Sequence, residues 1–329
     1  MGKRKKSRTV VIAGASSGIG RATALRFARE GWRVVVAARR EHALDELARQ
    51  CEEQGAEALA VPTDVTDVAA VERLADTAWR RFGEVDMWVN NAGVSLFSWF
   101  DDAPPDQYRR VIETDLFGTV NGARAALSRF RRQGHGVLVN TASITARLPQ
   151  PYASAYVVSK HGVKALGESL RQELWLRGER EIHVCTVMPA AIDTPFFQHA
   201  ANRTGRGVKA LPPVYPADKV AKTIVGLAAR PRREVVVGRA GRLLYLQWSL
   251  APGRTERLLA RLTDRQHLTD EPAPASEGNL FRPMQEGTEI SGGWRAPRPS
   301  LTRPAAAAAL LGAAAAAGWL VLRPQRGRR

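Results

Sequence analysis

Cysteine is scarce in this chain: Cys51 and Cys185 are the only two among 329 residues. A disulfide framework is therefore excluded, and such low usage is typical of a reducing, cytoplasmic compartment. The six histidines show no spacing suited to metal ligation, so the sequence predicts no metal site. An apolar export segment is missing as well, because the short run Thr9–Ala13 leads directly into glycines.

Acidic residues are also few, and the excess of base is concentrated at the two ends. The chain has 49 Lys and Arg against 32 Asp and Glu, a net charge of +17. Residues 1–8 hold five basic side chains and no acid, and residues 282–329 hold eight arginines and two glutamates. Such ends indicate contact with anionic lipid or nucleic acid, or simply solvated tails. No interior segment resembles a nucleic-acid reader, so nucleic acid is not an expected partner.

The sequence does contain a regular alternation of apolar strands and amphipathic helices. Strand-like runs are separated by segments of helical periodicity such as 21–30, 43–54 and 68–81. Continuous apolar strands alternating with helices predict an α/β protein with a doubly wound parallel sheet, the Rossmann arrangement. The expected strands are 10–13, 34–37, 58–61, 87–89, 137–140, 182–187 and 235–237.

The alternation ends near Gly238, which predicts one catalytic domain over residues 9–240 after a basic tail, 1–8. The rest of the chain divides by composition. Residues 241–269 have an amphipathic pattern, interrupted at Pro252-Gly253, that predicts a helical extension. Residues 270–304, with six prolines and four glycines, are expected to form an extended arm or linker. An Ala-rich apolar helix is expected at 305–322, before a second basic tail, 323–329.

Segment 305–322 leaves two interpretations open. Its 18 uncharged residues would span about 27 Å as a helix, slightly less than the ~30 Å apolar core of a bilayer. Alanine contributes little to insertion, so the segment is either a membrane anchor or surface helix, or a helix that docks on a partner. The first interpretation makes a membrane surface a candidate partner and the protein membrane-associated.

A glycine-rich turn connects the first expected strand to the first helix. It reads Gly14-Ala15-Ser16-Ser17-Gly18-Ile19-Gly20. Glycines let the backbone turn tightly and approach a pyrophosphate, which the N-terminus of the following helix attracts. This placement predicts a dinucleotide site formed by Gly14, Ser16, Ser17, Gly18, Ile19 and Gly20.

The second expected strand ends in Arg39 and Arg40 rather than in an acidic residue. An acid near this position bonds the ribose 2′-hydroxyl of NAD, whereas an arginine accommodates the 2′-phosphate of NADP. The sequence therefore predicts NADP(H) in preference to NAD(H), with Arg39 as the main contact and Arg40 as the second. The alternative is a solvated arginine at the start of a helix.

Tyr156 and Lys160 lie four residues apart in a helical pattern, and hence on one face. An ammonium beside a phenol favours the phenolate and lowers the tyrosine pKa. Tyr156 would then exchange a proton with a carbonyl oxygen at neutral pH. Ser143 follows the strand 137–140, at the sheet edge where ligands bind.

Together these motifs resemble the short-chain dehydrogenase/reductase family over about residues 8–240. In the family's order stand the glycine turn, Asp64-Val65, Asn90-Asn91-Ala92-Gly93, Ser143, Tyr156-x3-Lys160, and Pro189 with Ile192 and Thr194. The resemblance implies that Tyr156 is the general acid/base, that Ser143 holds the substrate oxygen, and that Lys160 bonds the nicotinamide ribose. It assigns the adenosine to Asp64, Val65, Asn90 and Ala92, and the nicotinamide carboxamide to Pro189, Ile192 and Thr194. Gly93 is also expected to bind the cofactor.

Three positions depart from the family's pattern. Ala13 replaces a threonine, Ala190 replaces a glycine, and Asp115 replaces the asparagine of the catalytic tetrad. In the family that asparagine helps to place a water between the lysine and solvent, partly through its backbone carbonyl. A carbonyl remains here, so we expect activity, with the carboxylate of Asp115 altering the rate and the pH optimum.

Apolar residues around the expected active site predict a hydrophobic carbonyl or alcohol as substrate, or else pack a loop or a subunit interface. The resemblance implies a homodimer or homotetramer joined through the helices that carry Asp115 and Tyr156. The predicted reaction is NADPH-dependent carbonyl reduction. The alternative, favoured by Asp115 alone, is a sensor or scaffold that binds NADPH without turnover. The expected substrate walls are Val94, Leu96, Phe97, Trp99, Phe100, Leu148, Pro149, Phe196 and Phe197.

Overall fold

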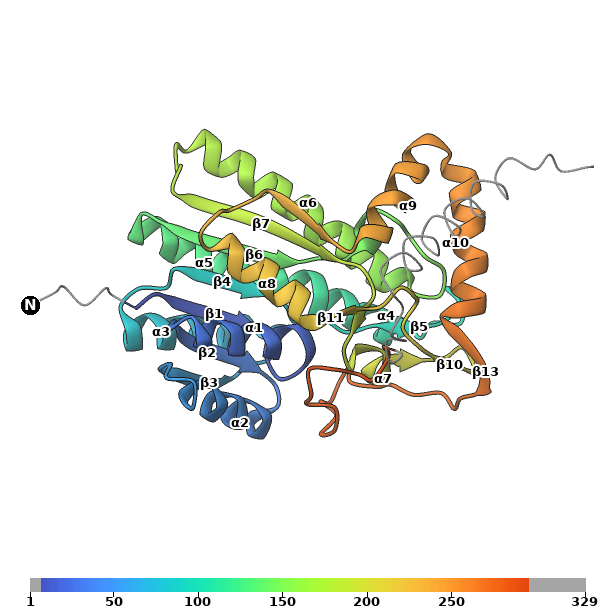
Figure 1. The fold of residues 1–329 in the computed structure, drawn as a ribbon, viewed down its shortest axis with the longest axis horizontal. Coiled ribbons are helices and arrows are strands. Elements are labelled where there is room, and N and C mark those ends of the chain that lie inside the picture. Colours follow the sequence, from blue (N-terminus) through green and yellow to red (C-terminus); the bar gives the residue numbers. More distant parts are fainter. Residues whose placement is uncertain (1–6, 296–329) are drawn as a thin grey trace, which may run out of the picture.

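Seven parallel strands form the central sheet of the computed structural model, which describes residues 7–295 and, of residues 242 and 243, the backbone only (Figure 1). Their order is β12-β7-β6-β4-β1-β2-β3. The order reverses between β1 and β4, the point at which doubly wound folds bind ligands. The predicted fold and all seven predicted strands are confirmed. The strands are β1 (Thr9–Ala13), β2 (Arg33–Ala38), β3 (Ala58–Pro62), β4 (Met87–Asn90), β6 (Gly136–Thr141), β7 (Ile182–Pro189) and β12 (Glu234–Val237).

Helices cover both faces of this sheet. One layer consists of α1 (Gly18–Arg29), α2 (Glu41–Glu52) and α8 (Ala217–Leu227), and the other of α3 (Val68–Phe82), α5 (Gly118–Gln133) and α6 (Ser154–Leu176). Successive strand residues point to opposite layers: Val10 and Ile12 pack in the first core, and Val11 in the second. Because both faces are buried, the strands read as continuous apolar runs.

Several short elements surround the carboxyl edge of the sheet. They are β5 (Leu96–Phe97), α4 (Pro105–Ile112), the π-helical turn η1 (Glu113–Phe117), the 3₁₀ turn η2 (Ile144–Ala146), β8 (Ile192–Asp193), α7 (Phe196–His199), β9 (Ala201–Asn202), β10 (Arg206–Val208) and β11 (Tyr215–Pro216). The segment after β4 reaches the segment after β7, because β5 pairs with β9. Apart from α4, these elements are two to five residues long, too short to carry a sequence periodicity, which is why the sequence did not predict them.

The chain after β12 returns to the same edge of the sheet (Figure 1). Helices α9 (Arg239–Leu250) and α10 (Pro252–Gln266) follow one another, and Pro252 occupies the first turn of α10, where its missing N–H costs nothing. Strand β13 (Leu268–Pro272) pairs antiparallel with β10. Residues 273–295, called the C-terminal arm below, contain no helix or named strand.

The Ala-rich segment 305–322, the tail 323–329 and most of the first tail lie outside the described residues. Within residues 7–295, no helix combines the length and apolar character needed to cross a membrane.

Candidate active site

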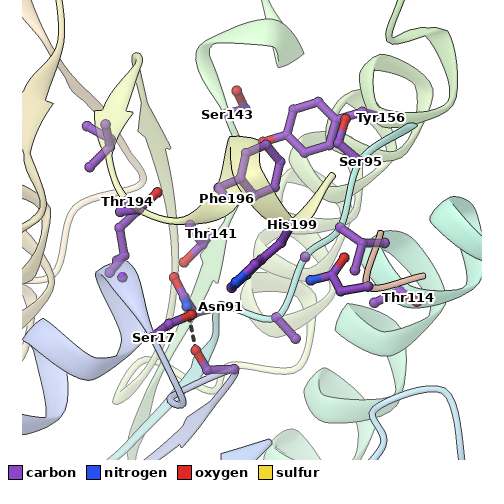
Figure 2. A pocket seen from close by; sticks show the side chains of 18 of the residues that line it. Ser17, Asn91, Ser95, Thr114, Thr141, Ser143, Tyr156, Thr194, Phe196 and His199 are labelled. Carbon is purple, nitrogen blue, oxygen red and sulfur yellow. Dashed lines mark hydrogen bonds between the residues drawn. The ribbon is translucent and has the colours of Figure 1, made fainter. Parts of the chain in front are cut away.

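A cleft of about 290 Å³ opens at the carboxyl edge of the sheet, where the strand order reverses. Its walls come from the β1–α1 turn, the ends of the strands, α6, α7 and the C-terminal arm. Figure 2 shows Ser143 and Tyr156 on one side of it and Ser17 and Thr194 on another. Residues far apart in the sequence therefore meet in one site.

The glycine turn forms a close-fitting backbone cradle at one end of the cleft. Gly14 has φ +85°, and a Cβ there would lie 2.4 Å from the Ala92 nitrogen. A Cβ on Gly20 would lie 2.0 Å from the Gly14 oxygen, and the Asn91 amide donates to that same oxygen at 2.9 Å. The turn therefore requires glycine, and it directs the N-terminus of α1 into the cleft. This cradle fits a dinucleotide pyrophosphate.

Ser143, Tyr156 and Lys160 line the same cleft. The β6–η2 turn positions Ser143, and α6 carries Tyr156 and Lys160 on one face. The Lys160 ammonium lies 5.3 Å from the centre of the Tyr156 ring and donates to the Thr141 carbonyl at 3.4 Å. The Tyr156 ring also packs against Phe196, with 5.5 Å between ring centres. The residues predicted to be catalytic are thus brought together.

Asp115 lies behind Lys160 and has no exposed surface. The π-helical turn η1 carries it, and its Oδ2 lies 3.1 Å from the Lys160 ammonium. Its Oδ1 accepts a hydrogen bond from the Val94 N–H at 2.8 Å. The residue that departs from the family's pattern therefore forms a buried ion pair with the lysine and does not itself line the cleft.

Burial dominates the protonation of this group. Burial raises the pKa of Tyr156, and the Asp115 carboxylate raises it further. The Lys160 ammonium and a hydrogen bond with Ser143 lower this pKa. The net direction is upward, opposite to the lowering expected from Lys160 alone. Burial by itself would lower the pKa of Lys160, but Asp115 and Tyr156 raise it above its ordinary value. Lys160 is therefore an ammonium at neutral pH.

Arg39 and Arg40 lie at the other end of the cleft, and both reach the C-terminal arm. Arg39 donates to the carbonyls of Asn279, Leu280 and Phe281, and Arg40 donates to Ser16 and to the carbonyls of Met284, Glu286 and Gly287. Neither guanidinium forms an ion pair with any described residue. The nearby carboxylate of Asp64 is held by Arg110 at 2.9 Å. These two cations have neutral hydrogen-bond partners, and the carboxylates of Asp64 and Glu289 act on them only at longer range, so the cleft can accept an anion beside them.

Several predicted site residues occupy other places. The Asn90 side chain is buried on the face of the sheet that α5 covers, where it donates to Asn140 Oδ1 at 2.9 Å, and Asn91 lines the cleft instead. Gly20 serves the packing of the turn rather than the cleft wall. Of the predicted substrate walls, Val94, Phe97, Phe196 and Phe197 line the cleft, Leu96 and Leu148 are buried outside it, and Pro149 is not part of its wall. Trp99 and Phe100 are 55% and 72% exposed, which corrects their assignment.

The remaining predicted cofactor residues line the cleft together: Ser16, Ser17, Gly18, Ile19, Asp64, Val65, Ala92, Gly93, Pro189, Ile192 and Thr194. Two histidines that line it were not predicted, because neither belongs to a motif. His199 in α7 bonds the Glu286 carbonyl at 3.1 Å. His267 follows α10 and stacks edge-on against Phe97 and Phe197. Burial lowers the pKa of His267 to about 4, so it is neutral at pH 7.

Residues 8–204 match the family model described as short chain dehydrogenase. The chain is 39% identical over 192 residues to 3beta-hydroxysteroid dehydrogenase 1 of Eggerthella lenta, which covers 58% of this chain and 72% of that one. This protein therefore belongs to the short-chain dehydrogenase family of oxidoreductases, which act on hydroxyl or carbonyl groups.

Solved structures of the family superpose on this fold. An alcohol dehydrogenase from Thermococcus sibiricus, complexed with 5-hydroxy-NADP, has a TM-score of 0.62 at 27% identity and covers 70% of this chain and 95% of its own. A short-chain dehydrogenase/reductase from Burkholderia phymatum, in complex with NAD, has a TM-score of 0.67 at 28% identity, covering 74% and 95%. The two bind different nicotinamide cofactors, so the likeness does not choose between NADP and NAD.

Proposed function

We propose that this chain is an NADP(H)-dependent oxidoreductase that interconverts a hydrophobic carbonyl compound and its alcohol. The observation that carries the cofactor preference is the pair Arg39 and Arg40, two partly or fully buried cations without an ion pair among the described residues. A 2′-phosphate would supply the missing negative charge, and Arg is well suited to bind it through several donors.

The chemistry follows from the group around Tyr156. A bound nicotinamide supplies or accepts the hydride. In reduction, the Tyr156 hydroxyl donates a proton to the substrate oxygen, which the Ser143 hydroxyl holds in place. The resulting phenolate is stabilised by the Lys160 ammonium, and Asp115 holds that ammonium at 3.1 Å. Asp115 is thus a positioning residue.

The raised pKa of Tyr156 favours the proton donor at neutral pH. A tyrosine that stays protonated is ready for carbonyl reduction, whereas alcohol oxidation needs the phenolate. Reduction is also the direction expected of an enzyme that uses NADPH.

The substrate end of the cleft is apolar with few polar groups. Val94, Phe97, Phe196 and Phe197 form its walls, which suits a hydrophobic ketone or aldehyde. The related enzyme of Eggerthella lenta is named for a hydroxysteroid, so bulky alicyclic ketones belong in a test panel. One polar group in this part of the cleft is His267, whose ring is neutral. Its Nδ1 donates to the Lys209 carbonyl, so its Nε2 is left as a hydrogen-bond acceptor.

Self-association is also proposed. Exposed apolar side chains lie on η1 and α6, where Phe117, Val158, Trp175 and Leu176 are at least half exposed. Such side chains suit contact with a second copy.

The function is tested by NADPH consumption with a panel of hydrophobic ketones and aldehydes, including alicyclic ones. We expect turnover with NADPH that exceeds turnover with NADH. Firm binding of NADPH without consumption on any panel member would instead favour a cofactor sensor.

Replacing Arg39 by aspartate should weaken NADPH binding by roughly 10- to 150-fold relative to NADH binding. This factor corresponds to a loss of about 1.5–3 kcal/mol, the usual contribution of a hydrogen bond to a charged group. Cofactor dissociation constants are measured by fluorescence titration. Loosening of the C-terminal arm would weaken both cofactors alike. The ratio of the NADPH and NADH dissociation constants therefore reports the contact with the 2′-phosphate alone. Arg29→Asp, an equal charge change on the exposed end of α1, is the control. Equal losses for both cofactors would contradict the assignment of Arg39.

Replacing Asp115 by asparagine should move the pH dependence of alcohol oxidation to lower pH. The Asp115 carboxylate raises the pKa of Tyr156, and oxidation requires the phenolate, so its rate rises as the pH passes that pKa. Removing the carboxylate lowers the pKa, while the amide oxygen can still accept from the Val94 N–H. The measurement is the rate against pH with saturating NADP. A profile that stays in place or moves to higher pH would contradict this coupling.

A further inference from the structure

The C-terminal arm follows the dinucleotide groove from one end to the other. Its carbonyls at 279, 280 and 281 accept hydrogen bonds from Arg39, and those at 284, 286 and 287 accept from Arg40. The Glu289 carbonyl then accepts the Gly18 N–H at 2.9 Å, and the Thr288 carbonyl accepts from Arg21. In order along the arm, these contacts run from the arginine end of the groove to the glycine turn.

The arm ends against β8 and the residues that follow it, where the Trp294 ring packs against Phe197 with 5.9 Å between ring centres. Asp193 accepts three hydrogen bonds from it: Ser291 Oγ at 2.7 Å, the Trp294 N–H at 2.8 Å and the Gly292 N–H at 3.1 Å. The Trp294 indole donates to the Thr194 carbonyl at 2.9 Å. The arm is therefore anchored at both ends of the groove and at its middle.

Three glycines of the arm lie in direct contact with the domain. A Cβ on Gly278 would lie 2.2 Å from the His199 carbonyl oxygen, and one on Gly287 would lie 2.3 Å from His199 Nε2. A Cβ on Gly292 would lie 2.3 Å from the Thr194 carbonyl oxygen. A side chain would not fit at these three positions, so the backbone of the arm lies directly against the domain.

The arm borders the cleft without filling it. Asn279, Pro283 and Met284 line the same cavity as the glycine turn and Tyr156. In the first turn of α1 only the Gly18 N–H is used by the arm, and the following N–H groups of Ile19 and Gly20 have no acceptor within the helix. Space and donors for a pyrophosphate thus remain beneath the arm.

We infer that residues 277–295 form the outer wall of the dinucleotide site and retain the bound cofactor, so that cofactor exchange requires the arm to detach. The inference rests on the proposed binding of a nicotinamide dinucleotide. Anchoring by separate hydrogen bonds suits this role, because water can replace each partner as the arm opens and the net cost of breaking a bond is smaller than its gross strength. In many enzymes such an opening step limits turnover.

The test compares Gly292→Ala with Gly226→Ala in the full chain. The added methyl at 292 meets the Thr194 oxygen, whereas a Cβ at 226, in α8, meets nothing within 4 Å. NADPH and NADH are each bound, and their release is followed by fluorescence after a chase with excess oxidised cofactor. Ser291→Ala provides a milder variant should alanine at 292 impair folding, because it removes the bond to Asp193 at 2.7 Å and the bond that Ser291 Oγ accepts from the Gly293 N–H at 3.1 Å.

We expect Gly292→Ala to speed release of both cofactors by roughly tenfold, Ser291→Ala by less, and Gly226→Ala not at all. Amide hydrogen exchange over 277–295 should slow when NADPH binds to the unmodified chain. Unchanged release in both arm variants would overturn the inference. So would faster cofactor binding with unchanged release, which would show that the arm blocks the groove. A chain that binds neither cofactor would refute the proposed function itself, and the inference with it.

Discussion

Replacing Tyr156 by phenylalanine is expected to lower kcat for carbonyl reduction by about 10²- to 10⁴-fold, the usual contribution of a positioned proton donor. The change removes only the hydroxyl. The ring remains packed against Phe196, with 5.5 Å between their centres, so the fold and NADPH binding should persist. Steady-state kinetics and a fluorescence titration with NADPH measure the two quantities separately.

Tyr152→Phe is the matched control for this substitution. Tyr152 precedes Tyr156 by four residues, but its hydroxyl donates to Asp264 at 2.9 Å and it does not line the cleft. Activity should survive there. If Tyr156→Phe kept its activity, the proton would come from another group and the assigned chemistry would be wrong.

The sheet and the glycine turn were predictable because their signals are local. The inner strands of the central sheet are buried on both faces and its edge strands β3 and β12 only in part, yet each is a short, mostly apolar run. The turn after β1 needs glycine where a Cβ on Gly14 would strike Ala92. The clustering of Ser143, Tyr156 and Lys160 in the cleft could also be predicted. Tyr156 and Lys160 have a helical spacing of four residues, and Ser143 follows the end of a strand. Such patterns are visible within a few residues.

The unpredicted features depend on contacts between distant segments. The arm that Arg39 holds lies 240 residues further along the chain, and no local pattern connects the two. The assignment of Asn90 rather than Asn91 to the cleft differs from the structure because the alternation of side chains along β4 turns Asn90 to the face of the sheet that α5 covers, where it donates to the Thr119 carbonyl. The sequence predicts a lowered pKa for Tyr156 from Lys160 alone. The pKa rises instead because Tyr156 is buried, and burial is a property of the assembled site that the sequence does not reveal.

Replacing Lys160 by methionine is expected to lower the free energy of unfolding by about 3–5 kcal/mol, the cost of leaving a buried charge without its partner. Asp115 has no exposed surface and Lys160 is 3% exposed, so water cannot replace the ammonium at 3.1 Å. Denaturation in urea gives the free energy. Lys164→Met, one turn along α6, removes a lysine from partly exposed pairs with Glu168 and, at 3.8 Å, Glu234 and should cost about 1 kcal/mol.

The loss should depend on pH and on Asp115. Burial raises the pKa of Asp115, and removing Lys160 takes away the ammonium that opposes this rise. A carboxyl whose folded pKa lies above its unfolded pKa stabilises the fold at low pH and loses that contribution as the pH rises through the folded value. The deficit of Lys160→Met should therefore shrink as the pH is lowered, and adding Asp115→Asn should recover most of it at neutral pH. A deficit that is independent of pH and unchanged in the double variant would mean that Lys160 stabilises the fold through packing rather than through its charge.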